Sequence, residues 1–453
     1  MKRYGWLLGC CLFLSIGMLW AADEPDLRML QQKAAQSRDM EGYVGVCKYL
    51  YQTEENPELL LLYADSIHQL ATKSKKPEQL VEYYIWASEG NFIKGDFQQG
   101  YALKRKAIAL AEKAGLKFAI SQSCCDMGYY CNVDARYDSA RYYFRKGLEA
   151  GEDLSEAGEA CRTMLTNYAS SFLFEGKTDS ALVYTIRASE RSAADKDTAM
   201  LIENLNQLGT IYRRKKNLEN CIANFEQALH LCELRGNHNA VAFIYGNIAT
   251  AYCDWNRPVD AIPFSEKAVE YALKTGNKRR IGTCYVNLGA IQIRLVQMRA
   301  EGIATLLKAI PILEEVNDRR LLCDAYNYLV NAYRMDGNLN QAMYYLQKLD
   351  KLAHEMQTDA ERFRYYQAKA GLLQESKNYT EAIVYYRRMI DMLRSGYKDT
   401  RDYEHYKRLA DCYLAVNNSS QAYEYLTQAY ALRDSAFHTE QTEQLSELSL
   451  IHI

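Results

Sequence analysis

The sequence predicts an all-α protein in which one helix pair recurs along the chain, and three observations lead to this prediction. A two-helix pattern stands out near the middle of the chain, and small residues repeat in register with it every 40 or 41 residues. The third observation is that the 453 residues include only six prolines. Because proline breaks helix interiors, so low a content suits an almost purely helical chain.

The two-helix pattern is clearest between Leu205 and Ala228. The first expected helix carries Leu-Gly-x-x-Tyr and ends near Tyr212. After a polar turn, the second expected helix begins at Cys221 with the pattern small-x-x-x-Phe-x-x-Ala. Two such helices joined by a short turn form an antiparallel helix hairpin.

Small residues recur in two columns that follow this hairpin through the sequence. The first column opens each second helix and comprises Gly100, Ala140, Ala181, Cys221, Ala261, Gly302, Ala342, Ala382 and Ala422. The second column, seven residues later, is small except at Leu349 and Met389, and comprises Ala107, Gly147, Ala188, Ala228, Ala268, Ala309, Leu349, Met389 and Ala429. Seven residues are close to two helical turns, so both columns lie on one helix face. Small side chains on this face predict a close approach between neighbouring helices.

The hairpin resembles the tetratricopeptide repeat, with Leu205 in the place of the consensus tryptophan. The resemblance covers about residues 77–435. The period of 40 to 41 residues exceeds the usual length of about 34, and the proline that closes the second helix is mostly missing. The resemblance implies a right-handed superhelical solenoid whose first helices line a concave groove. The long period is similar to that of repeats in bacterial regulators and kinesin light chains.

Four segments are expected in chain order. Residues 1–22 read as a signal peptide, and residues 23–76 as a capping helix followed by a degenerate repeat. Residues 77–435 hold nine repeats without an intervening linker, and residues 436–453 form a C-terminal helix. Its apolar ending leaves two alternatives, the last turn of an amphipathic helix or a truncated or foreign tail.

The first 22 residues predict export. Lys2 and Arg3 precede an apolar run from Leu7 to Trp20, and small residues follow at Ala21 and Ala22. This order is typical of a secretory signal, which indicates a periplasmic or cell-surface location. An uncleaved membrane anchor is the alternative, although the apolar run is short for a full span.

Composition and motifs favour a binding protein over an enzyme. The formal net charge of −2 offers no basic excess for nucleic acid. The sequence contains no glycine-rich phosphate loop, no nucleophile elbow and no His-Glu-x-x-His. Eleven of the 13 cysteines lie beyond residue 22, an odd number without a Cys-x-x-Cys pair, so we expect buried thiols and neither a disulfide framework nor a metal site. No cofactor is expected.

A recurring amide on the first helices is the candidate binding feature. It comprises Asn167, Gln207, Asn247, Asn287 and, displaced by one place, Asn327, with Asn206 and Asn331 beside it. An amide both donates and accepts hydrogen bonds, so a ladder of amides can pair with the backbone of an extended peptide. In the resembled family an asparagine near this position is used in that way. The alternative is that these amides only bridge adjacent helices.

The sequence therefore predicts a non-enzymatic scaffold that binds a protein or an extended peptide in a groove centred on residues 160–335. An alternative of a different class is the sensory input region of a membrane-spanning bacterial regulator whose kinase or DNA-binding output is missing from this chain. Attachment to a membrane would then use the N-terminus or a continuation of the chain.

Overall fold

A computed structural model describes residues 27–434, apart from 54–55, 357, 398 and 400–401. The described residues form α-helices joined by turns and short 3-10 segments, without a β-strand among them, which confirms the all-α prediction. The predicted signal peptide and the segment 436–453 lie outside the described residues. Among the helices described, none combines the length and the apolar character that a membrane span requires.

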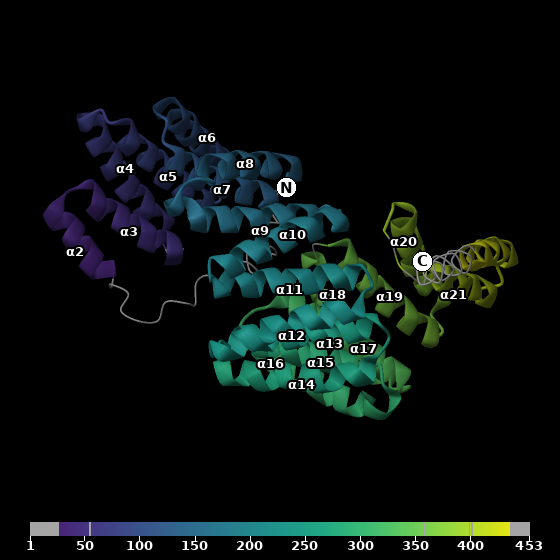
Figure 1. The fold of residues 1–453 in the computed structure, drawn as a ribbon. Helices are drawn as coiled ribbons and strands as arrows, with labels where there is room; N and C mark the ends of the chain where they lie inside the picture. Colours follow the sequence, from purple (N-terminus) through teal and green to yellow (C-terminus); the bar gives the residue numbers. More distant parts are fainter. Residues whose placement is uncertain (1–26, 54–55, 357, 398, 400–401, 435–453) are drawn as a thin grey trace, which may run out of the picture. The chain divides into compact units, whose positions relative to one another are not determined.

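The chain divides into two compact units, one up to Ala240 and the other from Val241. The first unit begins with α2 (Leu27–Ser37) and the pair α3 (Met40–Thr53) and α4 (Pro57–Ser74). Four longer pairs follow: α5 (Pro77–Lys94) with α6 (Phe97–Ala114), α7 (Lys117–Val133) with α8 (Tyr137–Gly151), α9 (Gly158–Phe174) with α10 (Thr178–Ala194), and α11 (Thr198–Arg214) with α12 (Leu218–Leu234). Figure 1 shows the members of these pairs side by side.

Helix α13 (His238–Asp254) contains the division between the units. The second unit continues with α14 (Pro258–Thr275), α15 (Lys278–Gln292), α16 (Arg299–Glu315), α17 (Arg319–Met335), α18 (Leu339–Leu352), α19 (Asp359–Glu375), α20 (Tyr379–Arg394) and α21 (Asp402–Ala415), and a helical segment covers residues 419–434. Among the described residues, α5 to α20 follow one another as eight pairs, and α21 precedes the helical segment at 419–434.

Polar turn residues cap several of the second helices. The Asp96 side chain accepts a hydrogen bond from the backbone N–H of Gln99 at the start of α6 (3.1 Å). Asn217 and Asn338 cap α12 and α18 in the same way. Such a cap satisfies one of the backbone N–H groups that the first turn of a helix leaves unpaired.

The Leu-Gly motif of the first helix exists because a large side chain of the second helix lies on the glycine. A Cβ atom at Gly209 would lie 2.5 Å from the ring of Phe225, and one at Gly128 would lie 2.3 Å from the ring of Phe144. Both small-residue columns are buried throughout. Glycine on one helix and the columns on the other therefore allow the close packing that the sequence pattern predicts.

The first helices line the inner side of each stack. In the first unit α9 contacts both α7 and α11, and in the second unit α17 contacts both α15 and α19. Among the described residues, second helices of successive pairs, such as α8 and α10 or α16 and α18, make no comparably close contact. Helices on the inner side of a curved stack approach each other most closely, so the inner surface belongs to the first helices.

The cysteines are part of the packing. All eleven described cysteines are free thiols, and each is buried except the half-buried Cys253. Burial raises the pKa of Cys47 and Cys124 to about 12, with a smaller contribution from the carboxylate of Glu82 at Cys47. Protonated, inaccessible thiols are poor nucleophiles, so these cysteines act as small apolar residues.

Candidate functional site

Helix α11 presents a stripe of polar side chains on the inner surface of the first unit. Glu203, Asn206, Thr210 and Arg213 follow one another at intervals of three or four residues, which places them on one helix face. All four are half-buried, whereas the apolar residues on the packed faces of α11 are buried. The stripe is thus open to a ligand while the rest of the helix is covered.

Glu203 lacks a partner within this stripe. Burial raises its pKa to about 7, and it has no hydrogen bond or ion pair with any other described residue. A carboxyl group that titrates near neutral pH can accept a hydrogen bond or pair with a cation, depending on the pH. It is therefore available for a donor that approaches from outside the chain.

Three of the predicted ladder amides lie beneath the surface. Asn167 is 5% exposed, Gln207 8% and Asn327 6%. The Gln207 amide donates to the Ser170 hydroxyl (2.7 Å) and accepts from the Thr185 hydroxyl (3.3 Å). It joins α9, α10 and α11, which is the helix-bridging alternative stated above.

Asn167 and Asn327 are held by neighbouring amides. The side-chain Nδ2 of Asn132 donates to the backbone carbonyl of Asn167 (2.9 Å), and that of Asn331 donates to the backbone carbonyl of Asn327 (3.1 Å). The side-chain oxygens of Asn167 and Asn327 are fully covered and have no donor among the described residues. A ligand cannot reach either oxygen in this conformation.

The remaining ladder residues are accessible. Asn206, Asn247 and Asn331 are half-buried, and Asn287 is exposed. Consecutive residues of a helix differ by about 100° in direction, so on α11 Gln207 faces the adjacent helices while Asn206 faces the inner surface. In the second unit the same column is accessible at Asn247 and Asn287. The structure places Asn206 in the first unit on α11 and the other three in the second unit on α13, α15 and α17.

The second unit carries a polar cluster that the sequence reasoning missed. Asp324 on α17 lies 3.6 Å from the guanidinium of Arg320 and 2.8 Å from that of Arg364 on α19. Burial raises the pKa of Asp324, and the two arginines oppose this shift. The side chains of Arg320 and Arg364 remain 46% and 42% exposed, so the cluster offers N–H donors at the surface. In the sequence, the four-residue spacing between Arg320 and Asp324 was the signal that could have indicated this cluster.

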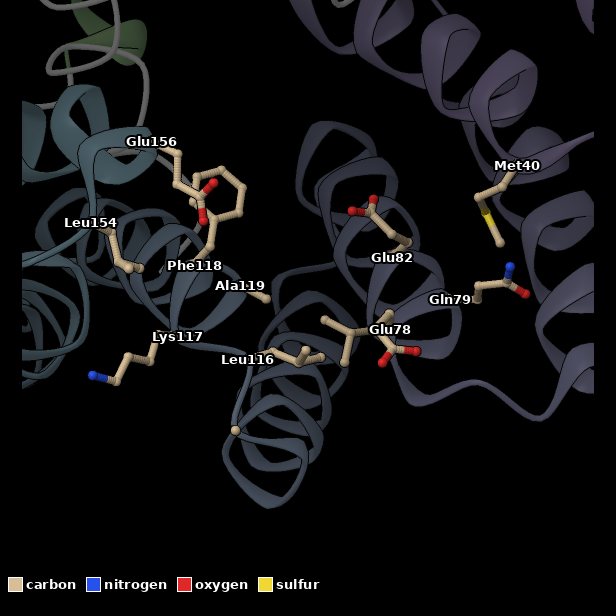
Figure 2. Close-up of a pocket in the computed structure, with 12 residues that line it drawn as sticks. Met40, Glu78, Gln79, Glu82, Leu116, Lys117, Phe118, Ala119, Leu154 and Glu156 are labelled. Atoms are coloured by element: carbon tan, nitrogen blue, oxygen red, sulfur yellow. The ribbon is translucent and has the colours of Figure 1, made fainter.

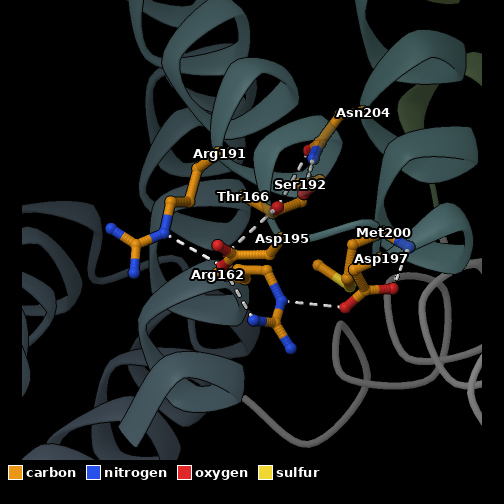
Figure 3. A network of polar contacts seen from close by, with 8 residues as sticks. All are labelled: Arg162, Thr166, Arg191, Ser192, Asp195, Asp197, Met200 and Asn204. Atoms are coloured by element: carbon orange, nitrogen blue, oxygen red, sulfur yellow. Dashed lines mark hydrogen bonds and ion pairs between the residues drawn. The ribbon is translucent and has the colours of Figure 1, made fainter. Parts of the chain in front are cut away.

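Buried neutral groups join α9, α10 and α11. The Thr166 hydroxyl donates to the side-chain oxygen of Asn204 (2.8 Å), and the Asn204 amide donates to the Ser192 hydroxyl (3.1 Å). Figure 3 shows this chain of contacts above a second group, in which Arg162 bonds Asp195 (2.9 Å) and Asp197 (2.8 Å). The two groups fix the spacing of the helices that carry the α11 stripe.

Buried charges join α5, α6 and α7. Lys104 is fully buried and forms ion pairs with Glu89 and with Asp126, the latter at 2.9 Å. The Tyr130 hydroxyl donates to the second oxygen of Glu89 (2.6 Å). Burial acts to lower the pKa of Lys104, but the carboxylates of Asp126 and Glu89 outweigh it and raise that pKa. Asp126 occupies the sequence column of Gln207, and it too joins helices.

The described residues contain no cluster of three or more histidine, cysteine or acidic side chains arranged to hold a metal ion. What the inner surfaces offer is hydrogen-bond donors, acceptors and charges of both signs.

Comparison with known proteins agrees with this architecture. Residues 200–274, which run from the first turn of α11 to the end of α14, match the family model of the tetratricopeptide repeat. This part of the chain carries tetratricopeptide repeats. No curated protein matches the sequence significantly.

Solved structures resemble the repeat fold over most of the chain. A signal transduction ATPase with a tetratricopeptide repeat sensor, from Pyrococcus horikoshii, aligns over 96% of this chain and 64% of its own, with a TM-score of 0.54 and 15% identity. This chain thus spans about two thirds of the length of that protein. The apo form of the quorum sensor NprR from B. thuringiensis aligns over 72% and 92% of the two chains, with a TM-score of 0.48 and 15% identity. A tetratricopeptide repeat protein from Parabacteroides merdae aligns over 64% and 98%, with a TM-score of 0.45 and 15% identity.

Proposed function

We propose that this protein binds an extended peptide or a segment of a partner protein along the inner surface of its first helices, and that it catalyses no reaction. The observation that carries the proposal is the α11 stripe, because Glu203 and Asn206 are open, polar and placed on a rigid helix. Packed helices fix the positions of the side chains, so little ordering entropy is lost when a ligand binds.

The ligand would be bound by its backbone and by its charges. Asn206, Asn287 and Asn331 supply accessible amides, each able to donate to a peptide carbonyl and accept from a peptide N–H. In the second unit, Arg320 and Arg364 supply guanidinium groups that suit carboxylate oxygens. Of the predicted amides, the accessible ones would contact the ligand, and the buried ones would hold the helices in place.

A selection experiment tests this function. Random peptides displayed on phage are selected against the full chain, and the affinity of a selected peptide is measured by calorimetry. We expect Asn206→Ala to weaken binding by about fivefold for a peptide held by the first unit, and Asn331→Ala to do so for a peptide held by the second, since one neutral hydrogen bond contributes about 1 kcal/mol. Asn220→Ala, an exposed substitution on the second helix α12, is the matched control and should leave the affinity unchanged. Equal affinities for all four proteins would refute the proposal.

A sensory role is the second candidate. It is supported by the shared fold with the Pyrococcus horikoshii protein, whose repeats are described as a sensor. In that case peptide binding would change the state of an output region encoded beyond this chain. Measuring whether the selected peptide alters the activity of the protein encoded by the complete reading frame separates a sensor from a scaffold.

We also propose that the chain is exported to the periplasm or the cell surface. The support is the sequence of residues 1–22, with Lys2 and Arg3 ahead of an apolar run. Fractionation of cells that express the full chain, with N-terminal sequencing of the product, tests this location. Recovery of the uncleaved chain from the cytoplasm would contradict it.

A further inference from the structure

An open groove of about 550 Å³ lies in the first unit, away from the α11 stripe. It crosses the starts of α5 and α7, and the segment between α8 and α9 completes it. Figure 2 shows Leu116 and Ala119 between Glu78 and Glu82 on one side and Phe118, Leu154 and Glu156 on the other. The groove is therefore built from three successive repeats together with Met40 at the start of α3.

The middle of the groove is apolar. Val81 is 1% exposed and forms part of the wall, together with Leu116, Ala119 and Leu154. Phe118 also lines the groove and keeps 41% of its surface exposed. An aromatic side chain that is open next to a concave apolar surface favours contact with another apolar group, because burial of apolar area is favourable.

The margins of the groove are acidic, and their carboxylates form no ion pairs within the described residues. Glu78, Glu82 and Glu156 line it, and none of them forms an ion pair with another described residue. Glu82 is half-buried, and the one hydrogen bond recorded for it is donated by the indole N–H of Trp86 (2.9 Å). The single cation in the lining, Lys117, points away from Glu78 and Glu82 in Figure 2.

The helix ends do not remove this negative charge. The starts of α5 and α7 each contribute a partial positive charge of about half a unit. The ammonium groups of Lys48 and Lys104 also act on Glu82. None of these positive charges forms an ion pair with Glu78, Glu82 or Glu156, so the three carboxylates stay available to a cation from outside the chain. Burial raises the pKa of Glu82, whose ionised form is consequently stabilised by an incoming cation.

From the apolar walls and the unpaired carboxylates we propose that this groove is a second docking site, and that it takes a basic segment of a partner protein. The segment would place an apolar or aromatic side chain against Phe118 and Leu154. Lysines or arginines on either side of that residue would pair with Glu78, Glu82 and Glu156. This site is separate from the inner surface of α11, so an experiment can refute either proposal and leave the other standing.

Fluorescence anisotropy with the full chain tests the site. The probe is a labelled short peptide with one phenylalanine between pairs of lysines, compared with versions that carry glutamate for lysine or serine for phenylalanine. We expect only the first peptide to bind well. The variant Glu78→Gln/Glu82→Gln/Glu156→Gln should weaken its binding by at least about tenfold, because each partly screened ion pair contributes a factor of about two to five. Glutamine at position 82 keeps an acceptor for Trp86.

The matched control is Glu219→Gln/Glu226→Gln/Glu233→Gln, which removes the same charge from the exposed side of α12 in the same unit. It should bind like the unaltered protein. Equal loss in both triple variants would show a general charge effect and overturn the proposal. Absence of binding to the unaltered protein, or equal binding of the lysine and glutamate peptides, would also overturn it.

The place of contact gives an independent readout. When the phenylalanine of the probe is replaced by photoreactive benzoylphenylalanine, we expect cross-links in the segments that contain Phe118 and Leu154. Cross-links confined to α11 would assign the peptide to the inner surface and overturn the second site, while leaving the proposed function intact.

Discussion

Two joints of the first unit hold successive repeats together with different chemistry. The joint of α5, α6 and α7 uses a buried ion cluster around Lys104, whereas the joint of α9, α10 and α11 uses amides and hydroxyls around Asn204 and Gln207. Asp126 in the first joint and Gln207 in the second occupy the same sequence column. At these two positions the column joins helices, whereas the ligand contact that we propose on α11, Asn206, lies on the neighbouring face.

Removing one side chain should destabilise the two joints by different amounts. Removal of one charge from a buried pair leaves an uncompensated ion, while removal of an amide leaves only unpaired neutral groups. Since each repeat contacts only its neighbours, the effects should also stay local.

The largest effect is expected at Lys104. Lys104→Met leaves the buried Glu89 and the half-buried Asp126 without their cation and should destabilise the α5–α8 region by about 3–5 kcal/mol. Hydrogen exchange of the α5–α8 amides measures this, with the amides of α17–α20 as an internal control. Lys104→Met/Glu89→Leu/Asp126→Leu removes the whole cluster and should recover most of the loss. If Lys104→Met alone changes no exchange rate, the cluster does not support this joint.

A smaller effect is expected at Asn204. Asn204→Leu deprives the hydroxyls of Thr166 and Ser192 of their shared partner, and it should destabilise α9–α11 by about 1–3 kcal/mol. Hydrogen exchange of the α9–α11 amides is the measurement. A cost equal to that of Lys104→Met would contradict the distinction between the two joints.

The effect of Glu203 on folding stability should depend on pH. Its pKa of about 7 in the folded protein exceeds the ordinary value of 4.5, so the folded state binds the proton more tightly than the unfolded state. Ionisation of Glu203 above pH 7 therefore weakens folding, and this effect disappears as the pH falls toward 4.5. We expect Glu203→Gln to raise the urea midpoint at pH 8 and to leave it nearly unchanged at pH 4.5. Because Glu203 is half-buried, solvent screening keeps the gain below the effect at Asn204. A midpoint that falls at pH 8 would contradict this assignment.

The smallest effect is expected at Arg162. Its ion pairs with Asp195 and Asp197 lie near the surface, where such pairs contribute about 1 kcal/mol or less. Asp197 keeps its cap on the N–H of Met200 in Arg162→Ala, so α11 should remain intact. Exchange rates in α9–α11 should change far less than in Asn204→Leu, and a larger change would mean that surface charges dominate this joint.

The fold was predictable from the sequence because the same packing contacts recur at a regular interval along the chain. Glycine and alanine recur wherever two helices touch, and Gly209 against Phe225 shows why. The candidate site was predictable only in part, since periodicity identifies a column but does not give its direction. Gln207 and Asn206 are adjacent in sequence yet differ in access, and that difference depends on the rotation of α11 against its neighbours. The pairing of Asp324 with Arg364 likewise depends on contact between α17 and α19.

The most direct test of binding through the first helices is a cross-linking map of a phage-selected peptide that carries benzoylphenylalanine. The proposed function predicts cross-links to first helices, either to α11 close to Asn206 in the first unit or to α15 and α17 close to Asn287 and Asn331 in the second unit. Cross-links that fall on the second helices α12, α16 and α18 would contradict it.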